Sequence, residues 1–204
     1  MKRFISVLSL CFLLASVSLS QFGFGAKGGI DFATIGGADA ISTSKTRTGF
    51  AVGAYAEFNI PFLLTIQPEV LYTTKGFELD GSILPDGPTS LIATNTYTYL
   101  EVPVLLKYVL PVPMVKPSLC VGPEVAFLLA ARSKYKRIDG GTNDDDYKSR
   151  TTSTDVGAVF GASAHILFVD VDIRYDLGLK TTIKDGSGKV YNRVWSIMVG
   201  IPLY

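Results

Sequence analysis

Apolar side chains alternate with small or polar ones from about residue 22 to residue 204, and the alternation restarts in eight successive runs. Successive side chains of an extended strand point to opposite faces, so a period of two is typical of strands whose two faces contact different surroundings. The connections between the runs are alternately short and long. Tight turns at one end and long loops at the other predict an eight-stranded antiparallel up-and-down transmembrane β-barrel, an all-β fold.

The eight expected strands follow one another directly along the chain. Their ranges are 22–34, 47–60, 63–79, 95–110, 115–132, 151–167, 169–179 and 192–204. The long connections are expected at 35–46, 80–94, 133–150 and 184–188, and the short ones at 61–62, 111–114 and near 168. An even number of strands returns both chain ends to the side of the short turns, which faces the periplasm in outer-membrane barrels.

The first 20 residues have the pattern of a removable export signal. Two basic residues precede an apolar stretch over residues 4–17, and Ser18-Leu19-Ser20 offers the small residues that a signal peptidase requires. We therefore expect residues 1–20 to be a signal peptide and residues 21–204 to form one outer-membrane barrel domain.

Charge and cysteine content exclude several other classes of protein. The chain has 19 basic and 18 acidic side chains, so it lacks the positive excess of a nucleic-acid-binding protein, and no nucleic acid is expected as a partner. Beyond the signal, no uninterrupted apolar run reaches the roughly 20 residues of a membrane-spanning helix. Removal of the signal would leave Cys120 as the single cysteine, so no internal disulfide is expected.

The alternation leaves open which face of the sheet points outward. A secreted ligand-binding barrel also alternates, with its apolar face inside. Here the second face mixes small residues with isolated charges of both signs, whereas a surface in water is usually densely charged. Aromatic residues recur near strand ends, as at Tyr72, Tyr108 and Trp195, where a membrane interface favours them. These features favour an apolar face toward lipid and a location in the bacterial outer membrane.

An apolar outer face places the charged side chains inside the barrel. An eight-stranded barrel is just wide enough for side chains to fill it, so we expect a packed polar core and not an open pore. A buried unpaired charge costs on the order of several kcal/mol, so we predict a structural network of ion pairs. Its expected members are Lys27, Glu57, Glu69, Lys75, Glu101, Lys107, Glu124, Asp155, Asp172 and Arg174, and Lys116 is also expected to face inward.

Four prolines lie inside expected strands, at Pro68, Pro103, Pro117 and Pro123. Proline cannot donate a hydrogen bond to a neighbouring strand, and a closed barrel has no free edge where that loss is harmless. We therefore expect at least one β-bulge next to these prolines.

Two motifs suggest ligands but lack the required context. Residues 23–28 spell a dinucleotide-binding fingerprint, yet no strand precedes it and no helix follows, so no cofactor is expected. Asp144-Asp145-Asp146 lacks the glycine and distal glutamate of a calcium loop, so no metal site is assigned. Cations bound to this loop could still bridge to lipopolysaccharide.

Ser163 and His165 share one strand face, and Asp155 lies farther along the same strand. A hydrolase needs a base within hydrogen-bond reach of its nucleophile and an acid that orients the base. Residues two apart on a strand are about 7 Å apart at their backbones, and no catalytic residue is assigned. An outer-membrane lipid hydrolase stays open as an alternative.

Several segments resemble the PorT-like outer-membrane β-barrel family, in the same order along the whole mature chain. They are Gly25 to Phe32, Gln67 to Tyr72 with Lys75-Gly76, Tyr99 to Tyr108, Gly122-Pro123-Glu124, and Asp172 to Tyr175 with Gly178-Leu179. The resemblance implies an outer-membrane barrel of this size and little about activity, although some members are linked to protein secretion. Tyr204 is the terminal aromatic residue expected of an assembly signal, but Gly200 and Pro202 occupy positions that are normally larger and apolar.

These observations predict an outer-membrane barrel with a structural or surface-interaction role, not an open porin and not an enzyme. An accessory component of protein secretion and a narrow solute pore are the alternatives, beside the lipid hydrolase. The expected partners are outer-membrane lipid and lipopolysaccharide, the barrel-assembly machinery, and a secretion or surface protein bound through the long loops, above all residues 133–150.

Overall fold

The computed structural model describes residues 22–36, 44–80, 92–136, 142–146, 153–180 and 191–203. Within these ranges the chain forms nine β-strands: β1 (Phe22–Gly36), β2 (Ser44–Ile60), β3 (Leu64–Asp80), β4 (Ile92–Val109), β5 (Val115–Lys136), β6 (Thr142–Asp146), β7 (Thr154–Ile166), β8 (Val169–Gly178) and β9 (Tyr191–Pro202). The described part of the chain contains no helix long and apolar enough to cross a membrane. The expected export signal and the expected loop at 184–188 lie outside the described residues.

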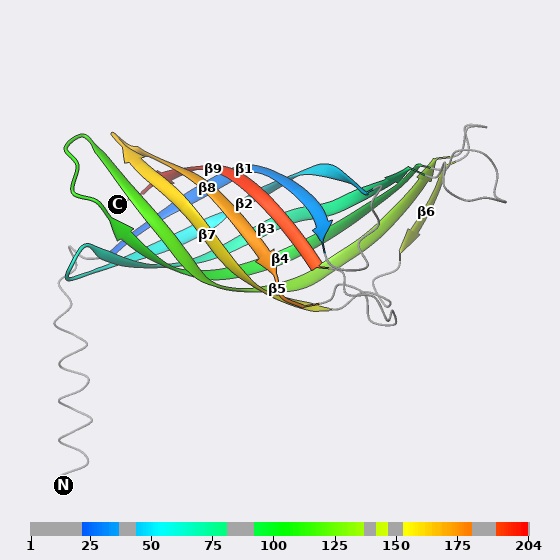
Figure 1. The fold of residues 1–204 in the computed structure, drawn as a ribbon, viewed down its shortest axis with the longest axis horizontal. Helices are drawn as coiled ribbons and strands as arrows, with labels where there is room; N and C mark the ends of the chain where they lie inside the picture. Colours follow the sequence, from blue (N-terminus) through cyan, green and yellow to red (C-terminus); the bar gives the residue numbers. More distant parts are fainter. Residues whose placement is uncertain are drawn as a thin grey trace, which may run out of the picture.

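Eight of these strands close into an antiparallel barrel (Figure 1). Each of them pairs with its neighbours in chain order, and β1 pairs with β9 to complete the ring. The short β6 pairs only with the end of β5, over Arg132 to Lys136. Closure gives every strand two partners, which satisfies backbone hydrogen bonding where no water is present. The predicted up-and-down barrel is therefore confirmed.

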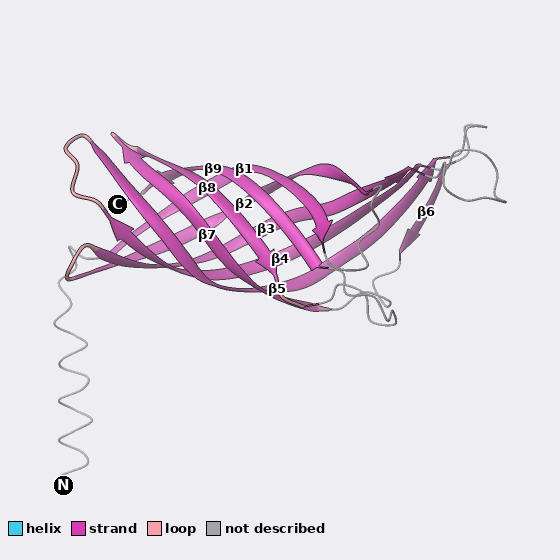
Figure 2. Ribbon diagram, viewed as in Figure 1, coloured by secondary structure: helices cyan, strands magenta, loops and turns pink. Residues whose placement is uncertain are grey.

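The two ends of the barrel differ (Figure 2). Three short turns, at 61–63, 110–114 and 167–168, lie at one end of the barrel. Phe22 and Leu203 lie at this end too, because Phe22 pairs with Phe58 beside the first turn and the Leu203 N–H bonds to the Phe24 carbonyl. At the opposite end the strands stop at different heights, because β5 has 22 residues and β8 has only 10. About 9–11 residues suffice to cross a bilayer, so β2 to β5 continue beyond the membrane as a one-sided wall. We call this projecting part, together with β6, the extracellular wall.

The extracellular wall corrects the predicted loops. Residues 133–150 were expected to be one long loop, but β5 continues to Lys136 and Thr142–Asp146 form β6. The strands β2 and β4 likewise begin three residues earlier than expected, at Ser44 and Ile92. The physical reason is that strand pairing continues in water, where hydrophobic alternation is no longer required.

The barrel has its apolar side chains outside and its charged side chains inside. Val104 is 41% exposed and Glu101, three residues earlier on the same strand, is 2% exposed. The large exposed hydrophobic residues come from every strand of the barrel, and the buried set includes Lys27, Glu69 and Arg174. This arrangement is the reverse of that in a soluble protein, and it confirms that the apolar face points outward, as a face toward lipid must.

The prediction of a bulge beside the prolines is wrong. Pairing of β5 with β7 keeps one register past Pro117 and Pro123, and pairing of β3 with β4 keeps its register past Pro68 although two steps of the ladder are missing there. The register shifts lie elsewhere, between Thr46 and Ala51 and between Thr98 and Tyr99. A proline removes one donor, and the ladder accommodates that loss by skipping a bond without an inserted residue.

Close approach of neighbouring strands depends on inward glycines near the skipped bonds. A Cβ atom at Gly122 would lie 2.0 Å from the carbonyl oxygen of Val104, and one at Gly53 would lie 2.0 Å from that of Val70. No side chain fits at either position without moving the next strand. These glycines therefore set how tightly the sheet curves around the charged lumen.

Candidate functional site in the lumen

Four charged side chains meet at the middle of the lumen, and we call them the central cluster: Lys27, Glu69, Asp172 and Arg174. The Lys27 Nζ lies 2.9 Å from Glu69 Oε1 and 2.7 Å from Asp172 Oδ2. The Arg174 guanidinium donates to both oxygens of Glu69, at 2.7 and 2.8 Å, and to Asp172 Oδ2 at 2.9 Å. Two cations thus neutralise two anions through short charge-assisted bonds, one of them bidentate.

The central cluster continues toward the short-turn end through a neutral side chain. Gln67 donates to Glu69 and accepts a hydrogen bond of 2.8 Å from Lys107. Lys107 also approaches Glu57 Oε1 at 3.4 Å. The ammonium of Lys27 lies 4.8 Å from the ring centre of Tyr55, within the range of a cation–π contact. The chain of contacts crosses the lumen from β2 and β3 to β8.

A second group of charges lies nearer the extracellular end, and we call it the upper cluster: Lys75, Glu101, Glu124 and Asp176. The Lys75 Nζ is 2.6 Å from Glu101, 3.6 Å from Glu124 and 4.0 Å from Asp176. All four side chains are buried or nearly so. In contrast to the central cluster, one cation here faces three carboxylates.

Two more carboxylates extend this acidic region. Asp31 is buried, and neither of its oxygens has a hydrogen-bond partner within the described residues. Asp155 accepts a hydrogen bond of 2.8 Å from Asn192 and one of 2.9 Å from the backbone N–H of Val156. The guanidinium of Arg47 reaches the same end of the lumen, where it donates to the carbonyl oxygens of Lys75 and Asn95.

The predicted lumenal residues differ in how deeply the structure buries them and in what they bond to. Eight of the ten are buried, and Glu57 and Asp155 are half-buried. Within the described residues, Asp155 accepts hydrogen bonds from the Asn192 amide and the Val156 backbone and from no cation. Lys116 faces inward as expected but is exposed, because it is the last inward position before the barrel ends. Gln67 and Asn192 were missed because they carry no charge, although both occupy inward positions of the alternation.

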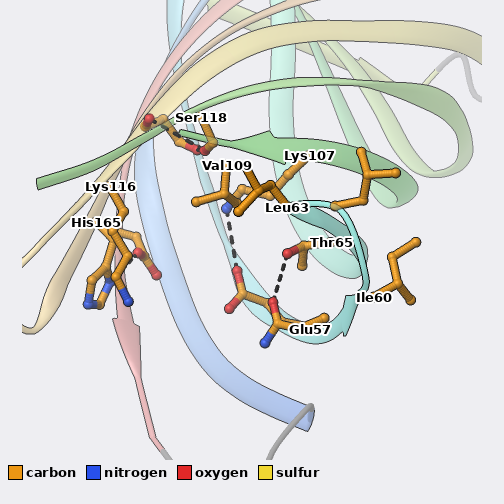
Figure 3. Close-up of a pocket in the computed structure, with 13 residues that line it drawn as sticks. Glu57, Ile60, Leu63, Thr65, Lys107, Val109, Lys116, Ser118 and His165 are labelled. Carbon is orange, nitrogen blue, oxygen red and sulfur yellow. Dashed lines mark hydrogen bonds and ion pairs between the residues drawn. The ribbon is translucent and has the colours of Figure 1, made fainter. Parts of the chain in front are cut away.

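A cavity of about 380 Å³ lies at the short-turn end of the lumen, and Figure 3 shows the side chains that line it. Its polar wall includes Glu57, Lys107, Lys116, Ser118, Ser163, His165 and Asp170. Asp170 accepts a 2.6 Å bond from the Tyr55 hydroxyl and lies 2.8 Å from His165 Nδ1. We call this cavity the periplasmic mouth.

The periplasmic mouth contains the residues of the hydrolase alternative without assembling them. The hydroxyl of Ser163 shares a 2.6 Å bond with Ser118, and within the described residues it has no bond to His165. Asp170, not Asp155, holds the imidazole. A nucleophile that does not contact its base is not activated. Among the described side chains, no group of three or more His, Cys, Asp or Glu residues is arranged to hold a metal ion.

Comparison with known proteins gives one family match. The model of the family described as outer membrane protein beta-barrel domain matches residues 15–184. No protein with a curated description matches the sequence.

Several solved structures are similar to this chain. Ail of Yersinia pestis, solved with the heparin analogue sucrose octasulfate, is 13% identical, with 90% of this chain and 99% of that chain covered and a TM-score of 0.45. Neisserial surface protein A is 16% identical, with coverages of 87% and 96% and a TM-score of 0.48. The outer membrane protein OprG of Pseudomonas aeruginosa is 11% identical, with coverages of 89% and 96% and a TM-score of 0.44.

Proposed function

The chain belongs to the outer membrane protein beta-barrel domain family, and from this premise we propose that it is a closed barrel of the bacterial outer membrane with a structural and surface-interaction role. The observation that carries the proposal is the central cluster. Its four side chains are each at most 4% exposed, and they connect β1, β3 and β8 across the lumen. A solute would have to break several short ion pairs to pass.

The lumen is closed by apolar side chains as well as by charges. Tyr55, Leu105 and Val159 point inward and are buried, so they fill space in the lumen beside the charged side chains. Removing one partner of a buried ion pair leaves an uncompensated charge at a cost of about 3–5 kcal/mol. The closed state is therefore the stable state of this barrel, which argues against a porin.

The extracellular wall supports the surface-interaction part of the proposal. It extends β-structure beyond the length that a membrane requires, and β6 adds a strand to its edge. We place the contact with a surface or secretion protein on this wall, and the contact with lipid and lipopolysaccharide on the outward face below it. A PorT-like subfamily membership, with a link to secretion, and insertion by the barrel-assembly machinery are the finer parts of the proposal.

Planar-bilayer recording tests the closed lumen. The wild-type barrel should give no stable conductance steps, whereas Arg174→Ser, which shortens the largest side chain of the central cluster, should give small transient steps. Stable steps from the wild type would favour the narrow-pore alternative.

Photo-crosslinking on intact cells tests the surface contact. A crosslinker at Lys134, which is exposed on β5, should capture a protein partner, and the same group at the lipid-facing position of Val104 should not. Equal capture at both positions would contradict a specific contact through the wall.

A further inference from the structure

The three short turns share an unusual composition. Residues 60–64, 109–115 and 166–169 contain no polar side chain at all. Turns in water are usually built from Gly, Asn, Asp, Ser and Pro, because these residues bond to water or to the turn itself. Here the prolines are accompanied only by large apolar residues.

The backbone of these turns departs from what water-exposed turns prefer. Phe62, Leu63, Met114 and Leu167 have φ angles of 69°, 64°, 66° and 58°. This left-handed region is rare for bulky residues and is normally occupied by Gly or Asn. A turn selected only for its backbone would therefore have glycine or asparagine at these positions.

Most of these turn side chains, and that of the neighbouring Phe168, point away from the protein. Phe62 is 89% exposed, Met114 86%, Leu167 73% and Phe168 72%. We call these four residues, with the half-exposed Leu63, the periplasmic rim. Its side chains make few contacts with the barrel, so packing does not explain their size.

The periplasmic rim is continuous with the lipid-facing surface. Ile60 and Ile66 flank the first turn and are exposed on the outward face, as are Tyr108 and Leu110 beside the second. On the inner side Lys116, His165 and Asp170 line the periplasmic mouth, and Ile60 and Leu63 lie at its edge. The rim therefore extends the apolar band below the last strand residues and surrounds a polar opening.

We propose that the periplasmic rim inserts into the inner leaflet of the outer membrane, with its side chains among the upper acyl segments of phospholipids. The depth follows from the backbone. Val112 N–H bonds to Leu110 and Leu110 N–H to Pro117, but a turn cannot pair every backbone group as a ladder does. Such groups need headgroups or water and are not tolerated at the bilayer centre. The boundary between headgroups and acyl chains accommodates both requirements.

Tryptophan quenching tests the depth directly, because Trp195 is the only tryptophan of the chain. In a Trp195→Phe background, Phe62→Trp, Met114→Trp and Phe168→Trp would each be folded into phosphatidylcholine vesicles. Lipids brominated near the headgroup end of the acyl chain should quench each tryptophan more strongly than lipids brominated near its methyl end. Aqueous iodide should quench each one weakly.

Two control positions calibrate this measurement. Val104→Trp should respond most to the deeply brominated lipid, and Lys134→Trp on the extracellular wall should respond to iodide alone. If the three rim positions behave like Lys134→Trp, the rim lies in water and the proposal is wrong. In that outcome the rim would be free to contact a periplasmic protein.

An asparagine series separates lipid contact from backbone strain. Phe62→Asn and Met114→Asn place a residue that tolerates the left-handed region at two strained positions. If the rim is inserted, each variant should fold into vesicles more slowly and unfold at a lower temperature than the wild type, although its backbone is relieved. A higher unfolding temperature for both variants would show that strain dominates and that no lipid contact is lost.

Discussion

The central cluster and the upper cluster lie in one lumen and are built by the same alternation, yet their charges balance differently. In the central cluster two cations meet two anions at distances of 2.7 to 2.9 Å. In the upper cluster, within the described residues, Lys75 lies 2.6 to 4.0 Å from three carboxylates. The alternation along each strand therefore determines which side chains are enclosed. Whether their charges cancel depends on which inward residues the other strands of the closed barrel bring beside them.

This difference assigns different roles to the two regions. A balanced group of paired charges costs less free energy to bury than a group with excess charge of one sign. We infer that the central cluster closes the barrel and contributes stability, and that the upper cluster tolerates the loss of a carboxylate farther from Lys75, such as Glu124.

The largest expected effect comes from the central cluster. Arg174→Met removes the bidentate partner of Glu69 and, within the described residues, leaves Lys27 to pair with both buried carboxylates. The free energy of unfolding should fall by about 3–5 kcal/mol, measured by urea unfolding in lipid vesicles. Arg193→Met, on the exposed outer face, is the matched control and should change it little. Equal losses in the two variants would contradict a stabilising central cluster.

The next largest effect is expected on the outer face of the barrel, where a charge has no partner as it would in the lumen. Val104→Arg places a cation in lipid near the middle of the barrel and should cost about 2–4 kcal/mol. Folding efficiency in vesicles measures it, with Val104→Ala as the control for lost side-chain volume. Assembly of Val104→Arg at the wild-type level would mean that this face does not contact lipid.

A smaller effect is expected within the upper cluster. Glu101→Gln weakens the shortest bond of Lys75 and should lower the free energy of unfolding by about 1–3 kcal/mol without preventing insertion. Glu124→Gln removes a more distant carboxylate from an acidic region and should leave stability unchanged or slightly higher. Heat-induced unfolding in detergent compares the pair. A lower unfolding temperature for Glu124→Gln than for Glu101→Gln would contradict this prediction.

The smallest effect is expected at the periplasmic mouth. The His165 side chain is 30% exposed, so His165→Ala should cost at most about 1 kcal/mol. Lipid turnover by the reconstituted barrel should be absent both before and after the change. Turnover that the substitution abolishes would instead establish the hydrolase alternative.

The alternation and the alternately short and long connections were sufficient to predict the barrel. The composition of the second face and the aromatic residues near strand ends then predicted its outward side and the enclosed charges. The alternation could not predict partners, because Lys27 and Asp172 pair across 145 positions of the chain, and that contact exists only after ring closure. The inward side of Lys116 was predicted correctly but its depth was not, since alternation does not show where a barrel ends. The extracellular wall was missed because its strands lie where hydrophobic contrast is no longer needed. The export signal at residues 1–20 stays a prediction.

The reactivity of Cys120 tests the closed lumen most directly. This free thiol is buried on the inward face of β5, and it would be the single cysteine of the mature chain. In the folded barrel in vesicles, a water-soluble maleimide should leave Cys120 unmodified, while the urea-unfolded chain reacts completely. Rapid modification of the folded barrel, at the rate of an exposed cysteine, would show that water fills the lumen and that the central cluster does not close it.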